Sequence, residues 1–131
     1  MTKPLPPLVE HCLELFAPLG VVRPKAMFGG WGFYLDELFF ALIADETLFL
    51  KVDEQTELAF RDAGSFPFTY TYKDGRSVTM AYWSAPEEAM ESPPMMHDWA
   101  RLAMGAALRG RHSAKKPVAP RKVANSTTPG R

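Results

Sequence analysis

Three glycines within four consecutive residues are the first candidate for chemistry in this sequence. They form Gly29-Gly30-Trp31-Gly32, directly after Met27 and Phe28. Glycine-rich loops bind phosphate when Gly-x-Gly-x-x-Gly leads from a strand into a helix N-terminus. Here the order is Gly-Gly-x-Gly and a strand pattern follows, so no helix N-terminus is available for an anion. We expect a bulged or sharply twisted strand whose glycines make room for aromatic rings, with a ligand-contacting loop as the alternative.

The sequence contains no complete set of residues for nucleophilic catalysis or for binding a metal ion. Cys12 follows His11 on an expected helix, and adjacent helical positions do not face each other. Cys12 lies on the apolar side of this helix, where a free cysteine behaves as a small hydrophobe. His97 and His112 are isolated, and no Cys-x-x-Cys pair or Gly-x-Ser-x-Gly elbow occurs. We therefore expect no catalytic residue, no metal, no cofactor and no enzymatic activity.

Aromatic side chains are the most abundant functional resource. They crowd two expected strands near the middle of the chain: Phe66, Phe68, Tyr70, Tyr72, Tyr82 and Trp83. Such rings could stack nucleic-acid bases if one face of the sheet were open. The other interpretation, which we favour, is that helices cover that face and the rings supply burial.

Cations gather at the C-terminal end of a chain whose net charge is zero. Residues 109–131 hold seven basic residues and no acid, which leaves eight basic residues against fifteen acidic ones in 1–108. The acidity of this body argues against nucleic acid lying on it, whereas the tail could neutralise phosphates without reading sequence. A solubilising tail, or one that folds back on the acidic body, is the alternative. The candidate nucleic-acid contacts are Arg109, Arg111, Lys115, Lys116, Arg121 and Lys122.

Length and composition predict one domain over residues 1–110 and a disordered tail over 111–131. A chain of 131 residues with 47% hydrophobic content can bury a core without metals or disulfides, and a lone cysteine excludes an internal disulfide. The tail mixes basic residues with Pro, Ser and Thr and has too little apolar surface to fold alone. We find no signal peptide, and the longest apolar run, 38–44, is far shorter than a membrane helix. We expect a cytoplasmic protein with no membrane contact.

Periodicity predicts an α+β fold, with a mainly antiparallel five-stranded sheet and N- and C-terminal helices packed on one face. The expected order is a helix, a three-strand meander with acidic two-residue turns, a short helix, a hairpin with a type I′ turn at Asp74-Gly75, and a last helix. Ser92 caps the last helix and Gly110 ends it. The expected elements are a helix over 7–17, strands over 26–35, 38–44 and 47–52, a short helix capped by Asp53 and ended just before Gly64, strands over 68–72 and 76–84, and a helix over 93–110.

The sequence resembles the N-terminal domain of the TfoX/Sxy family over residues 8–108. The resemblance rests on Arg23-x-x-x-Met27-Phe28-Gly29-Gly30-Trp31-Gly32, on the apolar strands 39–45 and 48–51, on Pro67-Phe68-x-Tyr70, and on a last helix through Trp99. It implies a regulator of transcription and DNA-uptake competence whose partner is the transcription machinery or one of its regulators. Full-length members continue into a second, helical domain. This chain is therefore expected to be a standalone member that lacks it.

The function predicted from these observations is a non-enzymatic regulatory domain that binds another macromolecule. A protein-interaction module without a nucleic-acid role, self-associating as a homodimer through a sheet edge, is the alternative. A third hypothesis is a small-ligand carrier or enzyme with a pocket beside Gly29-Gly30-Trp31-Gly32.

Overall fold

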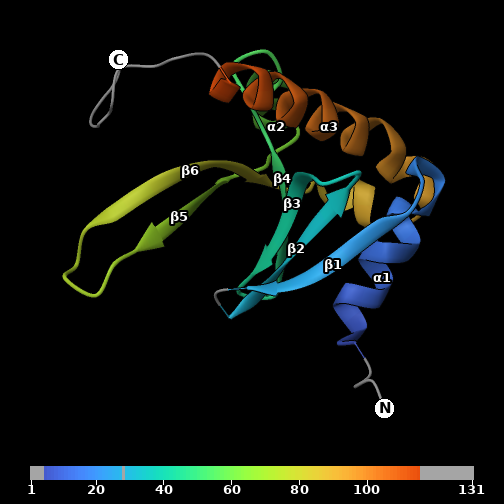
Figure 1. Cartoon of the computed structure of the whole chain (residues 1–131), viewed down its shortest axis with the longest axis horizontal. Coiled ribbons are helices and arrows are strands. Elements are labelled where there is room, and N and C mark those ends of the chain that lie inside the picture. Colours follow the sequence, from blue (N-terminus) through green and yellow to red (C-terminus); the bar gives the residue numbers. More distant parts are fainter. Residues whose placement is uncertain (1–4, 28, 116–131) are drawn as a thin grey trace.

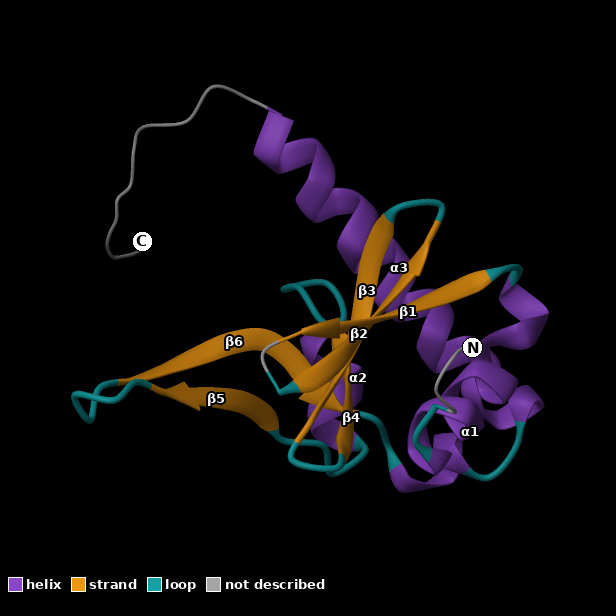
Figure 2. Ribbon diagram, turned by 60° about the horizontal axis from the view of Figure 1, so that its bottom comes forward, coloured by secondary structure: helices purple, strands orange, loops and turns teal. Residues whose placement is uncertain are grey.

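The computed structural model describes residues 5–27 and 29–115, with side chains through Arg111 (Figures 1 and 2). Its helices are α1 (Pro7–Phe16), the 3-10 turn η1 (Ala17–Leu19), α2 (Glu57–Asp62), the 3-10 turn η2 (Glu87–Met90) and α3 (Pro93–Lys115). Its strands are β1 (Val22–Met27), β2 (Gly30–Leu35), β3 (Leu38–Ala44), β4 (Thr47–Lys51), β5 (Pro67–Thr71) and β6 (Ser77–Ser84). None of the helices within the described ranges is both long and apolar enough to cross a bilayer.

The strands form one antiparallel sheet in the order β1-β2-β3-β4-β6-β5. The predicted α+β class, the antiparallel sheet and the two terminal helices are confirmed, but the sheet has six strands and the predicted five was wrong. The segment expected as one strand over 26–35 is split, because the chain reverses between Met27 and Gly30, which pair across a hairpin. β1 tolerates Pro24, which has no N–H to donate, because β1 is an edge strand.

The tight turns fix the register of the hairpins. Asp36-Glu37 and Asp45-Glu46 are two-residue turns, as predicted, and all four residues have positive φ between 50° and 65°. This is type I′ geometry, whose twist matches the flanking strands. The predicted turn at Asp74-Gly75 also closes a hairpin, but its type was wrong. Tyr72 and Arg76 pair around a three-residue loop in which Gly75 has a positive φ of 95°.

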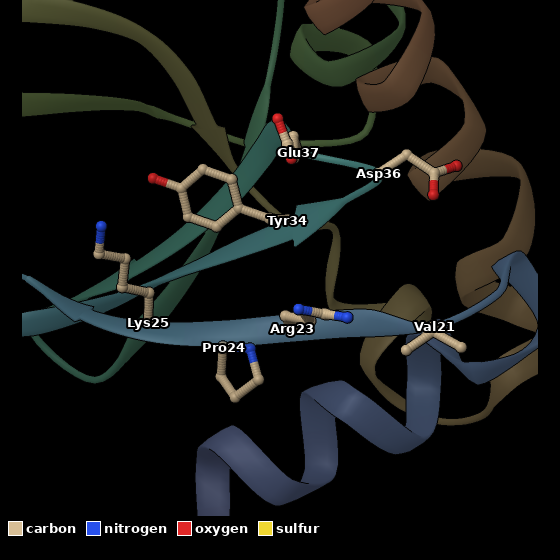
Figure 3. Close-up of a pocket in the computed structure, with 7 residues that line it drawn as sticks. All are labelled: Val21, Arg23, Pro24, Lys25, Tyr34, Asp36 and Glu37. Carbon is tan, nitrogen blue, oxygen red and sulfur yellow. The ribbon is translucent and has the colours of Figure 1, made fainter.

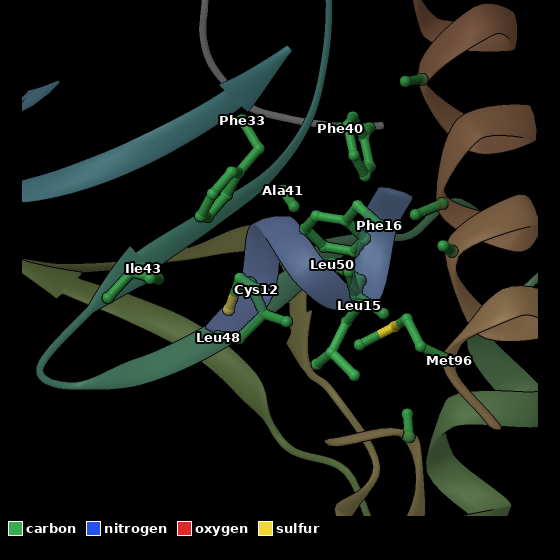
Figure 4. Packing of buried hydrophobic residues seen from close by; sticks show 14 of the residues in the cluster. Cys12, Leu15, Phe16, Phe33, Phe40, Ala41, Ile43, Leu48, Leu50 and Met96 are labelled. Carbon is green, nitrogen blue, oxygen red and sulfur yellow. The ribbon is translucent and has the colours of Figure 1, made fainter. Parts of the chain in front are cut away.

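The core lies between α1, α3 and one face of the sheet (Figure 4). Phe16 of α1 contacts the rings of Phe33 and Phe40 edge-on, with centroids 5.4 and 4.9 Å apart. An irregularity in the β2–β3 register leaves Phe40 opposite no partner, and both Phe40 and Ala41 are fully buried as a result. Met96 of α3 closes the cluster from the other side.

Helix α3 begins as predicted and ends later than predicted. The Met95 N–H donates to the Ser92 Oγ at 3.4 Å, which confirms Ser92 as the cap. The helix runs to Lys115, so the expected end at Gly110 was wrong. The turns around Gly110 are anchored by Arg109 and Arg111, whose side chains contact the body of the domain. Residues 116–131, with Lys116, Arg121 and Lys122, lie outside the described part of the chain.

Candidate functional site

The glycine motif shapes the β1–β2 hairpin. Gly29 has a φ of 77° at the reversal, where a side chain would be strained. A Cβ on Gly30 would lie 2.0 Å from the Ile43 carbonyl oxygen, and one on Gly32 would lie 2.8 Å from the Phe39 ring. Gly32 therefore makes room for an aromatic ring as expected. The expected bulged strand was wrong, since the chain reverses between Met27 and Gly30, with Gly29 in the turn.

The large side chains of Trp31 and Met27, beside these glycines, also pack within the domain. Trp31 packs against the core, and the Met27 Cε lies 2.7 Å from where a Gly32 Cβ would be. Phe28 lies outside the described residues. These contacts favour a mainly structural role for the motif.

A surface groove of about 700 Å³ lies at the far end of the β1–β2 hairpin from the glycines (Figure 3). In the close-up, Lys25 and Tyr34 point away from α1, whereas Pro24 points toward it. The groove mixes two cations with two carboxylates. Its lining residues are Val21, Arg23, Pro24, Lys25, Tyr34, Asp36 and Glu37. None of these lining residues belongs to the Gly29-Gly30-Trp31-Gly32 motif, although Lys25 pairs with Gly32 across the hairpin.

The side chains considered for nucleophilic chemistry are held apart. Cys12 is fully buried in the core, and its burial raises the pKa of the thiol to about 12. His11 instead contacts the Met90 carbonyl oxygen through Nε2 at 2.8 Å. Among residues 5–27 and 29–115, no three His, Cys, Asp or Glu side chains gather in a way that could hold a metal ion.

We expect Cys12 to be inert in the folded protein. A thiol with a pKa near 12 carries about one part in ten thousand thiolate at pH 8, and the thiolate is the reactive form. A chromogenic disulfide reagent should label no cysteine in native protein and one cysteine per chain in guanidinium chloride. Rapid labelling of the native protein, without unfolding detected by circular dichroism, would contradict the burial of this thiol.

Among the described residues, the helices pack on the core side of the sheet and leave its other face uncovered (Figures 1 and 2). Cross-strand partners share a face, so Arg23 with Tyr34, and Lys51 with Tyr82, lie on the same side. The rings of Tyr34, Phe39 and Tyr82 form a continuous row, with centroids 5.0 and 5.5 Å apart. Strand alternation assigns further residues to this side. We call this surface the open face: Arg23, Lys25, Tyr34, Phe39, Phe49, Lys51, Phe66, Phe68, Tyr70, Tyr72, Arg76, Val78, Met80 and Tyr82.

The aromatic residues of the second hairpin are mostly not core, which corrects the expected burial. Phe66, Tyr70 and Tyr72 are 56%, 46% and 42% exposed. The β5–β6 hairpin projects away from the helices (Figure 1), and every residue from Thr71 to Met80 is exposed. Tyr82 is buried as expected, and Trp83 is half-buried beneath Arg61 of α2. Periodicity identified these strands but could not show that the hairpin extends beyond the end of β4.

Charge is divided between the two sides of the domain. The only charged residues within the six strands are Arg23, Lys25 and Lys51, all basic and all on the open face. Eight of the fifteen acidic residues lie on or directly beside the helices and 3-10 turns: Glu10, Glu14, Glu57, Asp62, Glu87, Glu88, Glu91 and Asp98. The net acidity of residues 1–108 therefore describes mainly the helical side.

Two cations of the open face are held against aromatic rings. The Lys51 Nζ lies 5.0 Å from the Tyr82 ring centre, and the Arg76 guanidinium lies 4.8 Å from that of Tyr72. Burial lowers the pKa of Lys51, while the charge of nearby Asp53 opposes this. Burial also raises the pKa of Tyr82 well above its usual range, with a smaller contribution from Tyr34. Tyr82 is therefore a neutral ring at physiological pH.

The described basic residues of the predicted tail belong to α3. Arg109 pairs with Asp53 through two contacts, Nε to Oδ2 at 2.5 Å and an Nη donor to Oδ1 at 3.1 Å. The hydrogen bonds from Arg109 lower the pKa of Asp53. Burial acts in the other direction, and the positive charge of Arg109 lowers this pKa further. Arg111 donates to the Glu37 carbonyl oxygen at 3.0 Å, and Glu37 lines the groove. Lys115 is the last residue of α3. The Arg111 side chain of α3 thus reaches a residue that lines the groove.

Sequence reasoning missed Arg23, Lys25 and Lys51 as site residues. The available signal was the alternation of Val22, Pro24 and Ala26 with Arg23 and Lys25, which has the period of a strand. Pro24 conceals this pattern, because proline usually argues against a strand. For Lys51, only the pairing of β4 with β6 places the cation beside Tyr82.

These observations define the class of protein: a small α+β domain whose helices cover one face of an antiparallel sheet and leave an aromatic, basic face open. The chain belongs to the TfoX N-terminal domain family, whose model matches residues 14–107. It is similar to protein Sxy of Escherichia coli (strain K12), with 30% identity over 97 residues. That match covers 73% of this chain and 46% of Sxy, so the chain spans about half the length of this curated relative. The predicted family resemblance is confirmed.

Proposed function

We propose that this chain is a non-enzymatic regulatory domain that acts by binding another macromolecule through its open face. The observation that carries the proposal is the projecting β5–β6 hairpin. It exposes Phe66, Tyr70, Tyr72, Val78 and Met80 at 38–56% of their surface. Contiguous exposed apolar surface on a small domain marks an interaction site. A two-stranded ribbon alone is marginally stable in water, which favours a role that uses its exposed side chains.

Membership of the TfoX N-terminal domain family and the similarity to Sxy support a role in transcription and DNA-uptake competence. The proposed setting is the cytoplasm, where the transcription machinery or one of its regulators would be the protein partner. The separation of Cys12 from His11 gives no support to a catalytic role.

A reporter of DNA-uptake gene transcription tests this proposal, in a bacterial host that lacks its own regulator of this family. We expect the full chain to raise the signal and the double variant Tyr70→Ala/Tyr72→Ala to lose it. Leu58→Ala on α2, which is 67% exposed on the helical side, is the control and should keep it. An unchanged reporter with all three proteins would exclude competence regulation for this chain.

Self-association is the second candidate, favoured by the free edge of β5. If the β5 edges of two copies paired, main-chain hydrogen bonds between them would join the two sheets into one. Light scattering across a concentration series would report this as a rise in mass. A strictly monomeric protein at every concentration would exclude it.

A further inference from the structure

We propose that the open face is a binding surface for single-stranded nucleic acid, with bases stacked on its exposed rings and phosphates held by its strand cations. This inference rests on the proposed function and deepens it: it assigns nucleic acid, and not the protein partner, to the open face. The chemistry is shared by single-stranded DNA and RNA.

The rings supply stacking surfaces at the projecting end. Tyr70 and Tyr72 are nearly half exposed and meet edge to face, with centroids 4.9 Å apart and planes at 83°. A perpendicular pair offers differently oriented surfaces, which suits the splayed bases of a flexible strand better than a rigid duplex stack. Phe66 adds a third exposed ring, itself supported by Phe49 at 5.9 Å.

The cations lie where a backbone crossing the sheet would pass. Arg23 and Lys25 are exposed on the β1 edge, beside the half-buried ring of Tyr34. Lys51 lies near the middle of the strand order, and Arg76 lies at the hairpin. A strand running from β1 to the hairpin would therefore meet cations and rings throughout. This combination is typical of surfaces that bind single strands without reading sequence.

Charge separation favours this occupant over a second copy of the chain. Packing two open faces together would bring like charges, their cations, close to one another. The acids that could complement these cations lie mainly on the helical side. The acids nearest the open face are in turns. Asp74 is already paired with Arg76 at 2.8 Å, while Asp36 and Glu37 line the groove. A phosphate backbone complements the remaining positive charge.

The test is fluorescence anisotropy with labelled oligo-dT and oligo-U of about 12 nucleotides, and with a duplex of the same length. Truncation after Leu108 would remove Arg109 from Asp53 and cut α3, so the tail is neutralised instead. The test protein is the full chain with Lys115, Lys116, Arg121, Lys122 and Arg131 replaced by Gln. Binding is measured between about 50 and 200 mM salt.

We expect this protein to bind a single strand more tightly than the duplex. With three phosphate contacts, one for each strand cation, log K should fall against log salt with a slope of about −2. Arg23→Gln/Lys25→Gln should reduce that slope by about 1.4. Tyr70→Ala and Tyr72→Ala should each weaken binding about 5- to 100-fold. Tyr70→Phe, which keeps the ring, and Leu58→Ala should bind like the unsubstituted test protein. The comparison of oligo-dT with oligo-U shows which single strand is preferred.

Three outcomes would overturn the inference. One is no single-strand binding once the tail is neutralised, and another is equal binding by the Tyr70→Ala and Tyr70→Phe proteins. The third is tighter binding to the duplex than to the single strand, which would indicate that the hairpin inserts into a groove of the duplex. Such failures leave the proposed function standing if the reporter still depends on Tyr70 and Tyr72, and a protein then becomes the partner. Oligonucleotide binding without any reporter response would instead remove competence regulation alone.

Discussion

Replacing Gly30 with alanine should destabilise the domain by about 3 kcal/mol or more, a large loss for a protein of this size. The added Cβ would lie 2.0 Å from the Ile43 carbonyl oxygen. The obstacle is backbone in β3, not the end of a flexible side chain, so the β1–β2 hairpin must move away from its neighbour. Urea unfolding followed by circular dichroism would measure the loss. The melting temperature should fall by roughly 10 °C.

Gly29→Ala is the matched control for this prediction. Gly29 has open space around it but a φ of 77°, so alanine there meets only the left-handed backbone cost of about 1 kcal/mol. The two neighbouring glycines therefore separate conformational strain from close approach. Equal losses at both positions would contradict the contact with Ile43. The β1–β2 hairpin would then be less tightly seated on β3 than the geometry requires.

Local signals predicted most of the fold. The acidic turns between β2, β3 and β4, the Ser92 cap and the alternation in β5 lay where the sequence indicated, because each depends on neighbouring residues only. The sixth strand was missed because Gly29-Gly30 was interpreted as strand interior. A glycine pair has two local interpretations, and only the pairing of Met27 with Gly30 decides between them.

The candidate surface was harder to predict because it depends on which face the helices cover. Alternation in β5 and β6 gives two faces but does not say how far a hairpin extends beyond its neighbour. The charge total has the same weakness, since net acidity hides the placement of Arg23, Lys25 and Lys51 together. The predicted helix end at Gly110 was wrong for a related reason, because the contacts of this part of α3 are with residues far away in the sequence. Arg109 pairs with Asp53, which is 56 residues earlier in the chain.

Replacing a phenylalanine by alanine should cost much more stability on the core side of the sheet than on the open face. Phe16→Ala should destabilise the domain by about 3–5 kcal/mol, because Phe16 is fully buried and its ring supports both Phe33 and Phe40. Phe66→Ala removes the same atoms from a residue that is 56% exposed, so it should cost about 1 kcal/mol or less. Denaturant titration of the two variants measures both values.

Oligonucleotide binding completes this comparison. At a temperature where both variants are folded, Phe16→Ala should keep the affinity of the unsubstituted chain, since α1 lies beneath the opposite face of the sheet. Phe66→Ala should lose affinity while remaining stable, because it removes an exposed ring from the open face. A variant that lost both properties together would indicate that the open face depends on the core for its shape. Separate losses would mean that one face of the sheet holds the fold together and the other binds.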